Sequence, residues 1–353
     1  LGMDADPAQR NIFGVAQAQP QLARDGVRLR QIGQQIIELL GGKRIHPAWV
    51  VPGGVNRPLS PEAREAMLAV MPEGVALAQR TLEWFRGVEH QYAEEIAAFG
   101  TIPTHFLGLV TPEGDLEMYD GNLRIVDPAC AIVADQIHPD RFEEYIGEAV
   151  MPWSYLKAPY LRSLGYPDGI YRVGPLARLT LARRCGTPLA DAALEAFRTL
   201  DAQSSFHFHH ARLIEILYGF EMIAALLADP KTSSDRVRSI AEPNESVGIG
   251  VSEAPRGTLM HRYEIDRNGL ITYANLIIAT GHNNLAMDRG VAEVAKRYVH
   301  GESLNEGMLN RVEALIRTYD PCLSCSTHAL GQMPLHLELR RANGDVVDEV
   351  WRG

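Results

Sequence analysis

The sequence is poor in cysteine, with four residues of this type among 353. They are too few and too unevenly spaced for the disulfide framework of a small secreted protein. This scarcity favours a reducing compartment, and we therefore predict a cytoplasmic location. A chain of this length has ample material for one large buried core or two ordinary ones.

Long apolar runs and clusters of one charge sign are also lacking. No apolar stretch approaches the roughly 18 residues that a membrane span needs, because glycine, asparagine or a charged residue interrupts the longest ones. The 34 lysines and arginines are dispersed among 44 acidic residues, for a formal net charge of -10. We therefore expect neither nucleic acid nor a membrane as a partner.

Hydrophobic periodicity predicts a mainly α (α+β) fold, a large helical domain with small peripheral β elements. Helices are predicted over residues 23–40, from Pro61 to before Pro72, from there to about residue 99, over 204–229 and from about 305 to 319. Short strands are predicted in "THFLGLV" and "LRIVD", and "HRYEIDRNGLITYANLIIAT" predicts a hairpin with its turn at 266–269.

Near the end of the chain, Cys322 and Cys325 form a C-x-x-C pair, and His328 follows three residues later. Two thiolates at this spacing can share one soft metal ion. A structural zinc site needs four closing ligands, and the other two cysteines lie far off without paired spacing. A thioredoxin-like dithiol follows a strand, whereas this pair follows a predicted helix. The residues alone leave a metal site, a redox dithiol and chance proximity open, and we favour the metal.

The surrounding residues resemble a known family. "DPCLSCSTH" at 320–328 is similar to the D-P-C-x-x-C-x-x-H motif of the catalytic large subunit of nickel-iron hydrogenases. "EAPRG" at 253–257 resembles the arginine-bearing loop of that family, and "ATGHNNLAM" at 279–287 resembles the polar loop beside its active site. With "KRIHPAWVVPGGV", "GYPDGIYRVGPLARL" and "DADPAQRNIFG", the resemblance covers essentially the whole chain. It points to the cytoplasmic NAD-reducing (bidirectional) type.

The resemblance implies a nickel-iron centre whose iron carries carbon monoxide and cyanide. Cys322 would be a terminal nickel ligand, Cys325 would bridge nickel and iron, and His328 would bind a nearby magnesium ion or its equivalent. Soft thiolates suit both nickel and iron. Cys322 would also take the proton when H2 splits heterolytically.

Four further residues gain roles from the resemblance. Arg256 would hold its guanidinium over the open metal position, and Asp320 would pair with it. Pro255 and Thr280 would line the pocket of the diatomic ligands, with the Thr280 hydroxyl offered to a cyanide nitrogen. Considered alone, Arg256 could be a surface arginine of a turn and Thr280 could do no more than organise a turn.

Other reactive residues are predicted to be structural. The three histidines at 207, 209 and 210 point to different sides of a helix, which favours packing or solvation over a metal cluster. Cys130 and Cys185 are predicted as buried small apolar residues or spare thiols.

The resemblance also implies a larger assembly, because the chain has no cysteine pattern for an iron-sulfur cluster and no phosphate-binding G-x-G-x-x-G. The expected partners are a small iron-sulfur subunit, a flavin-containing diaphorase module that reduces NAD, and a maturation endopeptidase. The alternatives are a deazaflavin- or sulfur-reducing hydrogenase large subunit, a non-catalytic relative, and a plain thiol-metal binding protein.

Two expectations concern the ends of the sequence. The upstream C-x-x-C that supplies two nickel ligands in the family is missing, so we expect an N-terminally truncated chain that is inactive when purified alone. The endopeptidase of the family cuts after the motif histidine. We therefore expect an unprocessed precursor with a hydrogenase domain at 1–328 and a cleavable extension at 329–353, in which "LHLELRR" and "DVVDEVW" predict strands.

Overall fold

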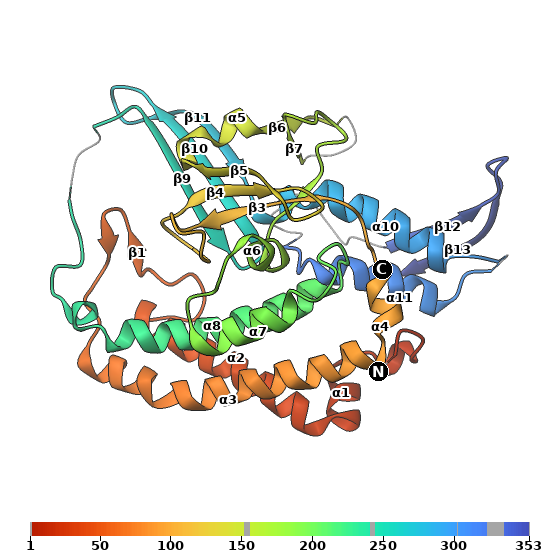
Figure 1. Ribbon diagram of the computed structural model, residues 1–353, viewed down its shortest axis with the longest axis horizontal. Coiled ribbons are helices and arrows are strands. Elements are labelled where there is room, and N and C mark those ends of the chain that lie inside the picture. The colour runs from red at the N-terminus through yellow and green to blue at the C-terminus, as the bar shows by residue number, and fades with distance from the viewer. Residues whose placement is uncertain (1, 152–155, 241–243, 302, 323–334, 353) are drawn as a thin grey trace.

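The computed structural model describes residues 2–151, 156–240, 244–301, 303–322 and 335–352. Long helices lie together on one side of the molecule, and most strands lie on the other (Figure 1). The helices are α1 (Ile12–Ala18), α2 (Pro20–Gly41), α3 (Pro61–Gln91), α4 (Ala93–Ala97), α5 (Phe142–Tyr145), α6 (Pro175–Leu181), α7 (Pro188–Phe197), α8 (His207–Ala228), α9 (Ala279–His282), α10 (Asn284–Tyr298) and α11 (Glu306–Thr318).

The predicted helix boundaries agree with local capping chemistry. The Ser60 hydroxyl accepts a hydrogen bond from the Ala63 amide at 3.1 Å, and Pro61 occupies the first position of α3. Gly42, at φ +78°, ends α2 in the left-handed conformation that glycine adopts without penalty. The helices predicted over 23–40, 204–229 and 305–319 are therefore confirmed as α2, α8 and α11.

The predicted break at Pro72 is wrong, because α3 continues through this residue. An interior proline removes a hydrogen bond and its ring clashes with the preceding turn, so it normally ends a helix. Here Met71 and Gly74 are buried, and a Cβ on Gly74 would lie 2.3 Å from the ring of Phe220 in α8. This close packing on α8 holds the helix together on both sides of the proline.

The strands form several small sheets. They are β1 (Val50–Val51), β2 (Gly54–Val55), β3 (His105–Val110), β4 (Asn122–Val126), β5 (Ile132–Ile137), β6 (Ile146–Ala149), β7 (Ala158–Leu161), β8 (Tyr171–Arg172), β9 (Val247–Ala254), β10 (Gly257–Ile265), β11 (Ile271–Ile277), β12 (Leu335–Arg340) and β13 (Val346–Arg352). The larger two have the orders β5-β4-β3-β8 and β11-β10-β9. The predicted hairpin is confirmed as β10 and β11, with β9 as a third strand.

Strand β3 lies between two hydrophobic clusters. Phe106 belongs to the cluster built mainly by helices, whereas Leu107 belongs to the cluster between the sheets. Both side chains are 0 % exposed, because successive residues of a strand face opposite sides. Helix α6 packs against both β3 and α8, so it joins the helical side to the sheets (Figure 1).

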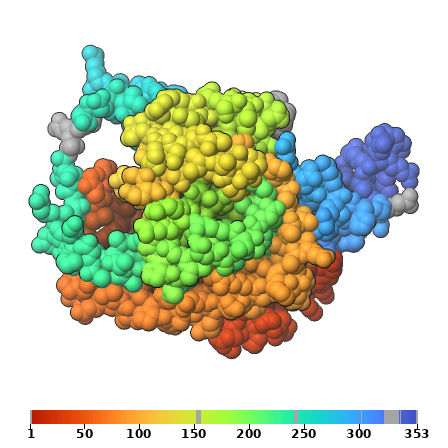
Figure 2. Space-filling model, viewed as in Figure 1, coloured from red at the N-terminus to blue at the C-terminus, as the bar shows by residue number. Residues whose placement is uncertain are grey.

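The last two strands pair as an antiparallel hairpin that projects from one end of the molecule, as Figure 2 shows. The strands predicted in the C-terminal segment are therefore confirmed. Across the residues that the structure describes, no helix combines the length and the apolar character needed to cross a membrane.

Candidate functional site

Arg256 lies in a two-residue turn between β9 and β10. Ala254 pairs with Gly257, so Pro255 and Arg256 form the loop of this hairpin. Gly257 has φ +142°, and a Cβ on it would lie 2.2 Å from the side chain of Val173. Glycine is required there because only it allows both this conformation and this close approach.

The Arg256 side chain extends to the segment that follows α11. Its Nε donates a hydrogen bond to the backbone carbonyl oxygen of Asp320 at 2.5 Å, and the Asp320 carboxylate lies 3.6 Å from the same nitrogen. The two side chains are 37 % and 46 % exposed. Tyr319, fully buried against Phe208 with ring centroids 4.8 Å apart, fixes the end of the helix from which this segment departs. The structure therefore brings Arg256 and Asp320 together, and their predicted role at a metal stays a prediction.

Cys322 is held from the other side by the polar loop at 279–287. Its backbone amide donates to the Thr280 hydroxyl oxygen at 3.1 Å, and Thr280 is buried. A hydroxyl has one proton to donate and can accept two hydrogen bonds, so accepting from Cys322 leaves the Thr280 O–H able to donate to another group. The Cys322 sulfur is disulfide-bonded in this structure, so it can bind a metal only after reduction to the thiol.

The polar loop is in turn fixed to the strand that precedes α6. The Asn283 side chain accepts from the Val173 amide at 2.9 Å and donates to its carbonyl at 3.3 Å. His282 Nδ1 lies 2.5 Å from the Tyr171 hydroxyl, and burial lowers the pKa of His282 to about 3. The imidazole is therefore neutral near pH 7.

The structure thus gathers five of the seven predicted site residues around one position: Arg256, Asp320, Pro255, Thr280 and Cys322. The predicted ligands Cys325 and His328 lie outside the described residues. The arrangement joins segments far apart in sequence, because the hairpin turn, α9 and the end of α11 meet there.

Sequence reasoning missed the buried charges behind the Arg256 turn. Arg178 in α6 is 1 % exposed and contacts Glu215 and Glu253, both of which have side chains at most 11 % exposed. Burial raises the pKa of Glu253, while the Arg178 guanidinium opposes that shift. Glu253 stands inside the "EAPRG" segment, which is the one signal that could have pointed to this network.

The histidine-rich start of α8 has a packing role. The Nδ1 atoms of His207 and His210 lie 3.0 and 2.6 Å from the two carboxylate oxygens of Glu89, and all three residues are buried. His207 and His210 therefore share one side of α8, so the prediction that they point to different sides is wrong for this pair, whereas their predicted packing role is confirmed. Of the predicted spare thiols, Cys185 is buried and Cys130 is exposed.

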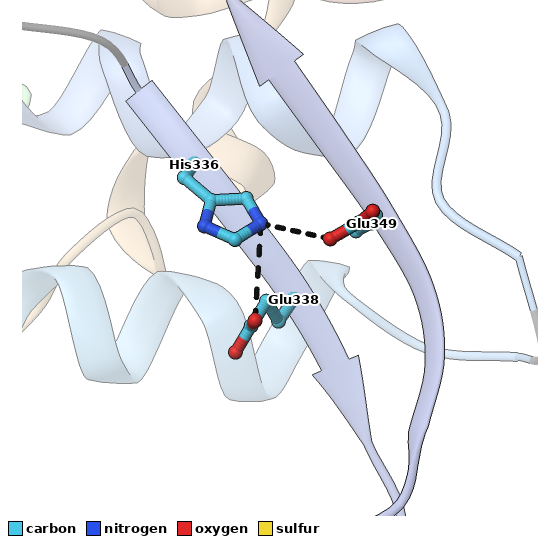
Figure 3. Close-up of side chains that lie close together, drawn as sticks. All are labelled: His336, Glu338 and Glu349. Atoms are coloured by element: carbon cyan, nitrogen blue, oxygen red, sulfur yellow. Dashed lines mark hydrogen bonds and ion pairs between the residues drawn. The ribbon is translucent and has the colours of Figure 1, made fainter.

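A second cluster of possible metal ligands lies on the β12–β13 hairpin (Figure 3). His336 Nε2 lies 3.2 Å from Glu349 and 3.9 Å from Glu338, and the Trp351 ring stacks on His336 with centroids 4.1 Å apart. Arg340 holds the other Glu338 oxygen at 2.5 Å, so the protein itself compensates this charge. These contacts account for the cluster as the internal packing of the hairpin.

Known proteins are similar to this chain over most of its length. The family model for nickel-dependent hydrogenase matches residues 134–328. The NAD-reducing hydrogenase HoxS subunit beta of Cupriavidus necator is 42 % identical over 99 % of this chain and 74 % of its own length. Sulfhydrogenase 2 subunit alpha of Pyrococcus furiosus is 28 % identical over 87 % of this chain and 68 % of its own.

The fold comparison gives the same result. The crystal structure of an NAD+-reducing NiFe-hydrogenase in the H2-reduced state superposes with a TM-score of 0.89 and 44 % identity. The match covers 93 % of this chain and 73 % of that one. The predicted fold class is therefore confirmed, and the chain belongs to the nickel-dependent hydrogenase family as a large-subunit type.

Proposed function

We propose that this chain is the hydrogen-activating subunit of an NAD-reducing hydrogenase and catalyses the reversible heterolytic cleavage of H2. The observation that carries the proposal is the meeting of Arg256, Asp320 and Cys322, with Thr280 holding the Cys322 amide. Asp320, which holds the Arg256 guanidinium, precedes Cys322 by two residues, and a reduced Cys322 thiol that can lose its proton near this cation would suit proton transfer at a metal.

The described part of the site fits a nickel-iron centre. Cys322 supplies the soft sulfur donor that nickel and iron prefer, and the Thr280 O–H remains able to donate to a cyanide on iron. We assign Cys325 as the bridging ligand and His328 as a ligand of a nearby magnesium ion, following the resemblance. Carbon monoxide and cyanide on the iron belong to the same proposal, in which Pro255 would line their pocket.

Each residue has a distinct task in the reaction. When bound, the centre supplies two metal ions that polarise H2 for heterolytic cleavage. Once reduced, the Cys322 Sγ would accept the proton. Arg256 would supply a positive charge near the site, and the hydrogen bond to the Asp320 carbonyl fixes the direction of its guanidinium.

Electrons must leave through other chains. We propose a small iron-sulfur subunit as the immediate acceptor and a flavin-containing diaphorase module that reduces NAD. The 42 % identity with a subunit of an NAD-reducing hydrogenase supports this choice. We place the assembly in the cytoplasm, where thiols such as Cys130 and Cys185 stay reduced.

We further propose that residues 1–328 form the hydrogenase domain and that 329–353 are removed by a maturation endopeptidase. The projecting β12–β13 hairpin of that extension is exposed, which suits access by another protein (Figure 2). Mass spectrometry of the chain before and after nickel insertion tests this: the mature form should lack the 25 residues from 329 to 353.

The function is tested on the purified complex whose large subunit carries this sequence together with the upstream C-x-x-C pair that the resemblance implies, because this sequence alone supplies only two of the expected nickel cysteines. We expect H2-dependent NAD+ reduction, with nickel and iron in the fraction that holds this chain. A complex that contains nickel and takes up H2 but does not reduce NAD+ would reject only the proposal that NAD+ is the electron acceptor. Absence of both nickel and H2 uptake from the intact complex would reject the proposal as a whole.

A further inference from the structure

The Arg178 guanidinium uses all its donors in one buried network. Its Nε and Nη2 donate to the two oxygens of Glu215 at 2.6 and 2.7 Å. Its Nη1 donates to Glu253 at 2.8 Å and to the Ala254 carbonyl at 2.9 Å, and Nη2 also reaches the Pro255 carbonyl at 3.1 Å. A guanidinium has five N–H groups, and these five contacts engage every one.

The two carbonyls that Arg178 binds immediately precede Arg256 in the chain. The second oxygen of Glu253 accepts from the Leu109 amide at 3.1 Å and from the Thr258 hydroxyl at 2.8 Å. The turn is therefore tied to α6 through Arg178 and to β3 through Glu253. On its other side, a Cβ on Gly174 would lie 2.7 Å from the Arg256 carbonyl oxygen, so no free space remains there.

Charge balance alone does not require this arrangement. The bidentate contact with Glu215 already pairs the guanidinium, and that pair would stabilise the charge without touching the turn. The three remaining donors are directed at Glu253 and at two backbone carbonyls of the 254–255 segment. We infer that Arg178 is a positioning residue, which fixes this turn so that the Arg256 side chain faces Asp320 and Cys322.

The inference concerns the direction of Arg256, so it is tested on the full chain by chemical modification. Phenylglyoxal modifies accessible guanidinium groups, and mass spectrometry of the peptide that contains Arg256 gives the rate at that residue. In Arg178→Lys, one ammonium cannot replace five directed donors, and we expect Arg256 to be modified about fivefold faster because the turn opens locally.

Arg124→Lys is the matched control. Arg124 is also a buried arginine, paired with both Asp135 oxygens at 2.9 Å and with the carbonyl of Leu181, the last residue of α6. In these hydrogen bonds Arg124 contacts no residue of the 253–257 segment. The rate of phenylglyoxal modification at Arg256 in Arg124→Lys should therefore stay within about twofold of the rate in the chain without substitutions. Equal acceleration in both variants would show general loosening and overturn the inference, as would no acceleration in Arg178→Lys.

A second variant guards against a folding failure. If Arg178→Lys shows no cooperative thermal transition, Glu215→Gln is measured instead, because it loosens Arg178 while keeping a neutral partner of the same shape. The expected change has the same direction. An unchanged Arg256 rate in a cooperatively folded Glu215→Gln chain would then count against the inference.

The effect of Arg178 on turnover rests on the proposed function. A double variant tests whether Arg178 acts through Arg256. In the complete complex, Arg178→Lys alone should lower turnover. The double variant, Arg178→Lys with Arg256→Lys, should be less than about twofold slower than Arg256→Lys alone. Additive losses would overturn the positioning role. The labelling experiment needs neither metal nor H2, so its result remains valid even if the complex has no hydrogenase activity.

Discussion

The hydrogen bond that fixes Arg256 is made to the backbone of Asp320, at 2.5 Å from its carbonyl oxygen, while the carboxylate lies farther away at 3.6 Å. Arg256 Nε is therefore directed by the course of the chain after α11. A lysine at 256 would have one mobile ammonium in place of a planar fork, and one ammonium could not make this contact and also place a positive charge at the proposed metal site.

We accordingly expect Arg256→Lys to retain the metals and to lose turnover by about two orders of magnitude or more, which corresponds to at least ~3 kcal/mol of transition-state stabilisation. Nickel content and H2 uptake of the complete complex are the measurements. Arg262→Lys is the control, since Arg262 lies in β10 of the same sheet and pairs with Glu143 and Glu264. Unchanged turnover in Arg256→Lys would remove this residue from the mechanism.

The hydroxyl of Thr280 gives a second prediction. Thr280→Val keeps the shape of the side chain and leaves the Cys322 amide without its acceptor, which should destabilise the segment by about 1 kcal/mol and reduce nickel per chain. Thr280→Ser retains the oxygen and should restore nickel. The assay is metal analysis of both variants after purification under identical conditions. Equal nickel contents would mean that the hydrogen bond plays no part in holding Cys322.

The buried Arg178–Glu253 pair gives a third prediction, on stability. Glu253→Ala leaves one N–H of Arg178, the Leu109 amide and the Thr258 hydroxyl without their buried acceptor, and we expect a loss of about 3–5 kcal/mol in the free energy of unfolding. Glu73→Ala removes the partner of Arg28 at the surface, where water replaces the lost contact, and should have a far smaller effect. Urea denaturation measures both, and similar losses would contradict the prediction.

His282 gives a fourth prediction, on pH. Burial lowers its folded pKa to about 3 from 6.5, so between these values the unfolded chain binds a proton that the folded chain does not. The contribution of His282 to the free energy of unfolding has its full value above pH 6.5. Below pH 6.5 this contribution decreases by about 1.4 kcal/mol for each pH unit, down to pH 3.

This dependence is checked by urea denaturation across pH 4–8. His282→Gln cannot take up the proton, so the number of protons bound on unfolding near pH 5 should fall by about one. Above pH 7.5 the stability difference between the two chains should be constant, which serves as an internal control. Identical slopes at acid pH would show that His282 does not contribute.

Much of the fold could be predicted because its signals are local. The apolar stripe of α8, the Ser60–Pro61 start of α3 and the Asp266 turn of the β10–β11 hairpin each lie within a few neighbouring residues. The course of α3 through Pro72 could not be predicted, because its cause is the contact between Gly74 and Phe220, which are 146 positions apart.

The candidate site also has residues that could be predicted from the sequence and residues that could not. Its motifs contain Arg256, Asp320, Cys322 and Thr280, and the structure brings all four together. The network behind the turn could not be predicted, because Arg178 meets Glu215 and Glu253 only through the packing of α6 on α8 and on the strands. Helical periodicity indicates that a residue is inside, but it does not identify the partner of a buried charge.

Asp320 has φ +50°, in the region that glycine, asparagine and aspartate enter most readily. Glutamate enters this region less readily, although Gln136 of this protein also has φ +50°. Glycine and asparagine would keep the backbone carbonyl that holds Arg256 but would lose the carboxylate that lies 3.6 Å from it. Aspartate combines ready access to this conformation with a negative charge near Arg256. A random library at position 320, selected for hydrogen-dependent growth, should therefore return aspartate more often than any other residue.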